Sequence, residues 1–264
     1  MRNNRGFTLI EIIVTLGVSL TMIVAIYALM NFAQKSSAGL ERKVAAQQDE
    51  KAAMELMSME IRMASCNPLC VSDSVLWVAA CDGTPAVSTQ KGIRVANANS
   101  IEIQMDVTDN AGSGTEDGVI GATNEIIQYN YNTVSHYITR ATNCGPAQPF
   151  LGAAGGASTV VKTVRVINNA YNPVIPVFRY FDGVGTDISA TVESDPANTR
   201  VGIPAIRRIQ ITLAVETENI DPNTRARKRM IYSTSVIVRN HAPNLQARNL
   251  KIERYLCSHQ SNII

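Results

Sequence analysis

Glu11 has the clearest chemical potential in this chain, because it is the only formal charge between Phe7 and Phe32. An ionised carboxylate in hydrocarbon costs about 2.5–3.5 kcal/mol on insertion scales, and such a residue usually has a charged partner. Cleavage after Gly6 would create a positive amino terminus at Phe7, close to the level of Glu11. We therefore predict an ion pair between Glu11 and a neighbouring subunit. The alternative is that Glu11 lies near the headgroups and reaches water without a partner.

The cysteines are the second reactive set: Cys66, Cys70, Cys81, Cys144 and Cys257. All follow the apolar run, so they are expected beyond the membrane, where disulfides persist. Cys66 and Cys70 flank an Asn-Pro-Leu triplet and can close a tight loop, for which Cys81 competes. An odd number leaves one thiol free or used between molecules, and the spacing does not fix the connectivity.

No pattern typical of a metal site, a cofactor site or an enzyme stands out. The set Cys257 and His259, with His241 or His136, fits no usual zinc spacing. Four acidic side chains offer oxygen ligands for calcium but depart from the EF-hand pattern, namely Asp106, Asp109, Glu116 and Asp117. The chain has no Gly-rich phosphate loop, no nucleophile elbow and no paired ligand histidines. We expect no metal, no cofactor and no catalysis.

One basic cluster raises the question of nucleic acid, namely Arg225, Arg227, Lys228 and Arg229. Arg207 and Arg208 are expected nearby, on the paired strand. The chain has 24 basic and 22 acidic side chains, and losing Arg2 and Arg5 would leave it formally neutral. Without a global basic field, we interpret the cluster as a solvated hairpin turn rather than a nucleic-acid patch.

These residues must be positioned by secondary-structure elements, and the apolar run predicts the first of these elements. Residues 7–33 are expected to span the membrane, because the run from Phe7 to Phe32 as an α-helix would reach about 39 Å, enough to cross a hydrocarbon core of about 30 Å. Residues 1–6 form a basic leader that the positive-inside rule keeps cytoplasmic. A secretory signal has a shorter apolar stretch with the cleavage site after it, whereas here the small residue, Gly6, comes first.

Residues 34–65 predict a continuation of the helix outside the membrane, because they lack proline and are rich in helix formers. An apolar stripe runs along this part, made of Met54, Met57, Ile61 and Ala64 and widened by Leu56, Met59 and Met63. We expect the stripe to pack on a sheet, with a groove for a partner helix as the alternative. Pro68 and its flanking cysteines end the helix.

Residues 66–264 predict a β-rich head. Alternating or short apolar runs indicate strands at 74–80, 101–107, 125–131, 135–140, 159–167, 174–180, 206–215 and 230–239. Residues 108–123 and 145–158 are rich in glycine and polar side chains and are expected to be loops. The fold class is therefore α+β, with a long stem helix packed on a mostly antiparallel sheet.

The segment Gly6-Phe-Thr8-Leu-Ile-Glu11 resembles the processing site of class III signal peptides, found in type IV pilins and type II secretion pseudopilins. The resemblance implies cleavage between Gly6 and Phe7 by a prepilin peptidase and N-methylation of Phe7. It also implies that Glu11, with Thr8 beside it, contacts the amino terminus of an adjacent subunit during assembly.

Further motifs, most of them in the head, resemble a narrower group within these families: the PilW-type minor pilins and the related J-type pseudopilins. Residues 126–131 followed by 136–140 are similar to their "x-Y-x-x … L-x-R" hairpin, and 177–183 to their "F-x-Y-Y-D-x-x-G" segment. Residues 206–213 and a strand ending at Asn240 are similar to their C-terminal sheet, and 53–62 fits their stem. The cysteines and the two glycine-rich loops depart from the pattern.

The resemblance implies a minor pilin that helps to initiate a type IV pilus and sits at or near its tip. The expected partners are other major and minor pilins, the prepilin peptidase and the inner-membrane assembly platform. The expected location is the inner membrane, single-pass with a periplasmic head, and then the pilus tip. The alternatives are a J-type pseudopilin of a type II secretion system and a tip module that binds surfaces or DNA.

Overall fold

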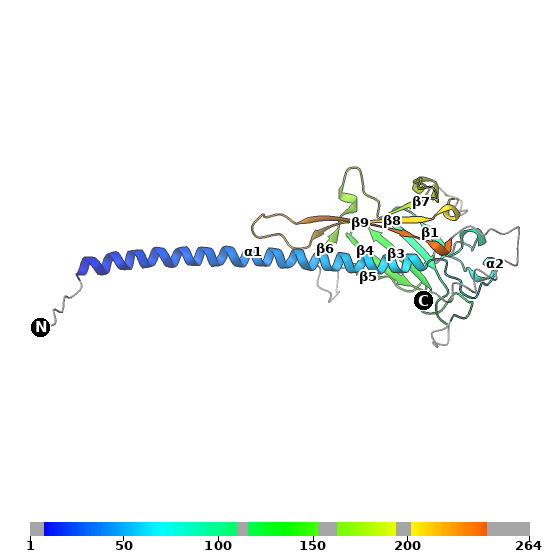
Figure 1. Cartoon of the computed structure of the whole chain (residues 1–264), viewed down its shortest axis with the longest axis horizontal. Helices are drawn as coiled ribbons and strands as arrows, with labels where there is room; N and C mark the ends of the chain where they lie inside the picture. The colour runs from blue at the N-terminus through cyan, green and yellow to red at the C-terminus, as the bar shows by residue number, and fades with distance from the viewer. Residues whose placement is uncertain (1–7, 110–115, 153–162, 194–201, 242–264) are drawn as a thin grey trace.

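The computed structural model describes residues 8–109, 116–152, 163–193 and 202–241. One long helix, α1 (Leu9–Met63), carries a β-rich head on its C-terminal half, and its N-terminal half projects away from the head (Figure 1). All the strand pairs within the described residues are antiparallel. The predicted α+β layout of a stem helix on an antiparallel head is therefore confirmed.

Helix α1 is continuous for 55 residues, or about 83 Å at 1.5 Å per residue. No proline interrupts it, and the change from apolar to amphipathic sequence near residue 33 leaves its backbone unbroken. It ends at Met63, where the N–H of Ala64 turns back to the carbonyl of Ile61 at 3.2 Å. The helix therefore stops five residues before Pro68, close to the predicted end.

The C-terminal half of α1 packs on the head through the predicted stripe. Ala46, Ala53, Met57 and Ile61 are buried and belong to the main hydrophobic core, with Met54 partly buried beside them. Two of the methionines expected to widen the stripe do not reach the core, because Met59 is 54% exposed and Met63 is 37% exposed. The prediction of sheet packing is confirmed, and the apolar face is narrower than predicted.

The first sheet has five strands in the order β1-β2-β3-β4-β5, so each strand pairs with its neighbour in sequence. They are β1 (Ile93–Ala96), β2 (Ser100–Gln104), β3 (Ile126–Asn132), β4 (Tyr137–Thr142) and β5 (Gln148–Leu151). The predicted hairpin at 125–140 is present as β3 and β4, with Tyr129 opposite Arg140. This register places both side chains on the same face of the sheet.

The second sheet is built around β8 (Arg208–Thr217), which pairs along nearly its whole length with β9 (Arg229–Ile237). Strand β6 (Val164–Val166) pairs with the C-terminal end of β8, and β7 (Phe178–Phe181) pairs with its N-terminal end. Short helices fill the connections: α2 (Asp73–Leu76), α3 (Ser189–Glu193), η1 (Ser88–Gln90), η2 (Asn168–Ala170), η3 (Ile203–Ala205) and η4 (Arg239–His241).

Several element predictions are wrong. Residues 74–80 form no strand, because Asp73 accepts a hydrogen bond from the indole of Trp77 at 2.9 Å and closes the turn of α2. The expected loop at 145–158 contains β5, and β1 was not predicted. The polar face of β2 is covered rather than solvated: Glu102 and Gln104 are both fully buried and bind the backbone of residues 78–81. Residues 159–162 of the strand predicted at 159–167 lie outside the described residues.

The cysteines do not close the loop that we considered at the end of the stem. Cys66 is a free thiol, partly buried against the main core, whereas Cys70 is disulfide-bonded and exposed. Cys81 forms a disulfide with Cys144, which ties the segment after α2 to the end of β4. Burial, with the nearby carboxylates Asp106 and Glu116, raises the pKa of the Cys66 thiol and keeps it protonated. Cys257 lies outside the described residues.

The β8–β9 hairpin runs along α1 toward the N-terminal half of the helix (Figure 1). The Arg42 guanidinium donates to the carbonyl of Ile220 at 3.0 Å, and the Gln47 amide donates to the Tyr232 hydroxyl at 3.1 Å. Gly39 passes close to the hairpin, since a Cβ there would lie 3.2 Å from the Asp221 carboxylate. The hairpin is therefore fixed to the stem near its tip and also midway along β9.

Replacing Tyr232 with phenylalanine is expected to lower the free energy of unfolding by about 0.5–1.5 kcal/mol, the usual net contribution of one hydrogen bond. The ring stays, so packing against the stem is kept and only the bond to Gln47 is lost. The measurement is denaturant unfolding of the full chain in detergent, followed by the fluorescence of Trp77. Tyr27→Phe, at a side chain 69% exposed on the projecting half of α1, is the matched control and should leave the midpoint unchanged.

Candidate assembly site

The N-terminus of α1 is organised by Thr8 and Glu11, which form a capping box. The Thr8 hydroxyl accepts from the Glu11 N–H at 3.3 Å, and the Glu11 carboxylate accepts from the Thr8 N–H at 3.2 Å. A carboxylate in the first turn also interacts favourably with the positive end of the helix dipole. Gly6 and Phe7 lie outside the described residues.

The projecting half of α1 offers an uninterrupted apolar surface. Every residue from 8 to 30 is exposed, and large side chains such as Leu9, Tyr27 and Leu29 are each at least 69% exposed. By length and composition α1 can cross a membrane, and none of its most apolar window is buried in the chain itself. A surface of this size needs lipid or other helices to cover it.

The stem is joined to the first sheet by a charged clamp at Glu60, which is only 7% exposed. Its carboxylate receives both Nη2 and Nε of Arg140, at 2.7 and 3.2 Å, and the hydroxyl of Tyr129. Burial and the Glu60 charge raise the pKa of Tyr129, so its hydroxyl remains a donor. The two strand residues that face each other across β3 and β4 thus hold the same carboxylate of α1.

The end of the stem is held by Ser65 and His241. The His241 ring lies 2.9 Å from the Ser65 hydroxyl through Nδ1 and 2.9 Å from the Ile203 carbonyl through Nε2, and Ser65 also accepts from Gly92 N–H at 3.0 Å. A carbonyl can only accept, so Nε2 carries the proton and Ser65 donates to Nδ1. Burial lowers the pKa of His241 to about 4, which keeps the ring neutral. The Ser65–His241 pair, called the latch below, therefore has a structural role: it holds the end of the stem against the head.

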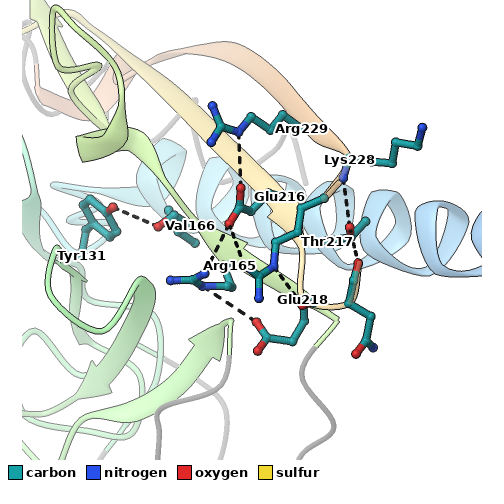
Figure 2. A network of polar contacts seen from close by, with 10 residues as sticks. Tyr131, Arg165, Val166, Glu216, Thr217, Glu218, Lys228 and Arg229 are labelled. Atoms are coloured by element: carbon teal, nitrogen blue, oxygen red, sulfur yellow. Dashed lines mark hydrogen bonds and ion pairs between the residues drawn. The ribbon is translucent and has the colours of Figure 1, made fainter. Parts of the chain in front are cut away.

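The predicted basic cluster is largely neutralised. Figure 2 shows Arg165 of β6 and Arg229 of β9 converging on Glu216 of β8, at 3.4 and 3.3 Å. Arg227 also lies within 3.9 Å of Glu216, and Lys228 lies 3.0 Å from Asp221. Figure 2 places Lys228 and Arg229 at the start of β9, beside Glu216 and Thr217 of β8.

The expectation that Arg207 and Arg208 join this cluster is wrong, because they lie at the other end of β8. Arg208 pairs in register with Ile237, and its guanidinium stacks 3.9 Å from the centre of the Phe181 ring. Arg207 instead donates to the His241 carbonyl at 2.8 Å. Along β8, Arg208 and Glu216 are separated by about 27 Å at 3.4 Å per residue.

Two of the acidic residues considered for calcium, Asp106 and Asp117, accept hydrogen bonds from the backbone, Asp117 from the Val119 N–H at 2.9 Å. The neighbouring Glu125, which was not one of the four candidates, does the same. Glu125 accepts four N–H groups, those of Val107, Thr108, Gly121 and Ala122, at 2.8–3.2 Å. Asp106 accepts from the Gly118 N–H at 3.2 Å, and burial raises its pKa. Within the described part of the chain, which excludes 110–115, no group of three or more His, Cys, Asp or Glu side chains is placed to hold a metal ion. Asp109, Glu116 and Asp117 do not join Asp106 in such a group.

Sequence reasoning missed the Glu60 clamp, although a signal was present. Glu60 and Glu50 are charged residues on the buried side of the stem, in line with Ala46, Ala53 and Met57. A carboxylate in an apolar stripe needs a partner, so it predicts a complementary group on the opposing sheet. Identifying Arg140 as that partner required the tertiary structure.

Comparison with known proteins bears on the N-terminus alone. Residues 1–27 match the family model of the prokaryotic N-terminal methylation motif. No curated protein and no solved structure gave a significant match. The chain therefore carries a class III prepilin signal and is pilin-like, with an apolar helix suited to membrane anchoring, and this points to a structural protein rather than an enzyme.

Proposed function

We propose that this chain is a minor pilin that helps to initiate a type IV pilus and sits at or near its tip. The observation that carries the proposal is the Glu60 clamp. Tyr129 and Arg140 come from the very hairpin that resembles the PilW-type pattern, and both hold the stem carboxylate. A head fixed rigidly to its stem can be positioned by helix packing alone, which suits a subunit that templates the addition of others.

The N-terminal residues support the assembly step. A prepilin peptidase cleaves between Gly6 and Phe7 and the new amine of Phe7 is methylated, leaving residues 7–33 as the membrane span, 34–65 as the periplasmic stem and 66–264 as the head. Glu11 then pairs with the amino terminus of an adjacent subunit, while Thr8 orients the first turn. In the isolated chain the Glu11 carboxylate accepts a hydrogen bond from the Thr8 N–H of the capping box. On assembly, Glu11 exchanges this partner within the chain for the amino terminus of the adjacent subunit.

The partners follow from the exposed surface of α1. Major and minor pilins cover its apolar half in a helix bundle, and the assembly platform in the inner membrane lifts the subunit from lipid. Before assembly the chain stands in the inner membrane with its head in the periplasm. No nucleic-acid partner is proposed, because Arg227, Lys228 and Arg229 already have acidic partners within the head.

The proposal is tested by deleting the gene and imaging surface filaments, with complementation by the wild type, Glu11→Gln or Glu55→Gln. We expect the deletion and Glu11→Gln to lack pili, because glutamine cannot neutralise a neighbouring amine. Glu55 is exposed on the same helix, so Glu55→Gln should restore piliation. Immunoblots of membrane fractions confirm that each variant is present.

Two outcomes contradict the minor-pilin role. Normal pili together with a secreted enzyme trapped in the periplasm would assign the chain to the J-type pseudopilins. Normal pili with normal secretion would leave a surface-binding module as the leading alternative.

A further inference from the structure

The tip of the β8–β9 hairpin lies close to the end of the apolar helix. Gly39 and Arg42 of α1 contact Asp221 and Ile220 of the hairpin. Gly39 is six residues beyond Ala33, or about 9 Å along the helix axis. That separation is no larger than the Debye length of about 10 Å at 0.1 M salt, so charges here are only partly screened from a membrane surface. The tip also reaches farther toward the N-terminal half of α1 than the strands do (Figure 1).

The stem and hairpin at this level carry an excess of positive charge. On α1, Lys35, Arg42 and Lys43 are exposed, with Glu41 as their acidic neighbour. On the hairpin, Arg225 is exposed and has a backbone φ of +53° at the turn. We name Lys35, Arg42, Lys43 and Arg225 the basic collar.

The remaining charges of the tip largely cancel. Lys228 is paired with Asp221 at 3.0 Å, and Arg227 binds the Glu218 carbonyl at 3.0 Å while lying 3.9 Å from Glu216. The positive excess therefore rests on the basic collar rather than on the paired residues of the tip.

The outer surface of the hairpin tip has the exposed residues expected of a segment that contacts a membrane interface. Residues 222–226 are all exposed, and Ile220 presents an apolar side chain that is 54% exposed. An exposed apolar residue beside basic side chains is the arrangement with which peripheral segments enter the headgroup layer of anionic bilayers. Lys35 stands between this surface and the apolar helix, so the basic side chains continue to the membrane boundary.

We propose that the basic collar and the β8–β9 tip dock on the anionic phospholipid headgroups of the membrane that α1 spans. The proposal rests on the membrane insertion contained in the proposed function. Its consequence is that the unassembled subunit has a defined orientation: the stem and its rigidly attached head cannot tilt freely relative to the bilayer, since one edge of the head is held against it. Assembly must release this contact when the helix leaves the lipid.

The test uses the full processed chain in nanodiscs, made either of phosphatidylcholine or of phosphatidylcholine with phosphatidylglycerol. A nitroxide is attached at Asn223→Cys in a Cys66→Ser background, and the paramagnetic enhancement of lipid ³¹P relaxation is measured. We expect a markedly larger enhancement in the anionic discs, abolished by high salt. Arg225→Gln or Lys35→Gln should each lower the equilibrium constant for docking about fivefold, the contribution expected of one basic residue near such a surface, and the anionic-lipid enhancement should fall with the docked fraction.

Two controls use the same chain. A nitroxide at Val184→Cys, a side chain 89% exposed in the turn after β7, should give little enhancement in either disc. Arg62→Gln, which removes an exposed charge from the far end of the stem, should leave the Asn223→Cys signal unchanged.

Equal enhancement at Asn223→Cys in the two kinds of disc, or no response to Arg225→Gln and Lys35→Gln, would overturn the docking proposal while leaving the minor-pilin role intact. Failure of the chain to enter nanodiscs at all would overturn both, because the span itself would then be wrong. An enhancement that lipid composition does not change would favour an acidic protein, in place of lipid, as the partner of the tip, and it also counts against the proposal.

Discussion

Replacing Glu60 with alanine is expected to lower the free energy of unfolding by about 3 kcal/mol, at the lower end of the 3–5 kcal/mol found when one partner of a buried ion pair is removed. Arg140 would lose two charge-assisted hydrogen bonds and the Tyr129 hydroxyl its acceptor. The lower end applies because the Arg140 side chain is 23% exposed and can recover some hydration.

The measurement is denaturant unfolding in detergent, read by Trp77, the only tryptophan of the chain, which is 4% exposed. Far-UV dichroism would be dominated by α1, whereas Trp77 reports on the head. Glu55→Ala, at an exposed position of the same helix, should stay within about 0.5 kcal/mol of the wild type.

A double-mutant cycle separates the clamp from a general loss of packing. Glu60→Ala and Arg140→Ala are expected to be non-additive, with a coupling energy of at least about 1 kcal/mol, because each variant already removes the same interaction. Strict additivity would mean that the two side chains act independently. The clamp would then have no role in fixing the head to the stem.

Replacing Glu50 with leucine is expected to raise stability, by about 1–3 kcal/mol at pH 8. Glu50 is fully buried, and among the described residues neither of its carboxylate oxygens has a hydrogen-bond partner. Burial raises the pKa of Glu50 to about 8 from its ordinary value of 4.5. An apolar residue of similar size would remove an unsatisfied polar group from the seam between stem and sheet.

The sign of the pH dependence follows from linkage. Between pH 4.5 and 8 the folded chain keeps the Glu50 proton while the unfolded chain releases it. The unfolded state therefore binds fewer protons, and this group's contribution to stability falls as pH rises across that interval. The wild type should lose stability relative to Glu50→Leu from pH 5 to pH 8, measured as the difference in unfolding midpoint. A gap independent of pH would show that Glu50 does not titrate in this interval.

The stem and the hairpins were predictable because their signals are local. An apolar run without proline gave the projecting half of α1, and the alternating residues of 125–140 and of 206–239 gave the β3–β4 and β8–β9 pairs. Glu11 stood out because a lone charge in an apolar run is costly, whereas Gly6 and Thr8 were singled out by the resemblance to class III processing sites. Their roles in cleavage and assembly remain predictions.

The missed features depend on distant parts of the chain. Strands β1 and β5 are four residues each and lie at the two edges of the first sheet, so their short sequences carry little alternation. Glu102 and Gln104 look like a solvated face until the segment at 78–81 covers them. The Cys81–Cys144 disulfide joins residues 63 positions apart, and only the fold brings them together.

The attachment of the head to α1 has a mechanical consequence. Within the residues that the structure describes, polar contacts join head and stem at Arg42, Gln47, Asp49, Glu60 and Ser65. They are spread over 23 residues, or about 35 Å of helix. A pull along the helix axis therefore loads these contacts in shear and in parallel, so the tension is shared among them and they do not open one after another. The head should consequently transmit force to the stem as a rigid body, and detachment would require the clamp, the latch and the hairpin contacts to rupture together.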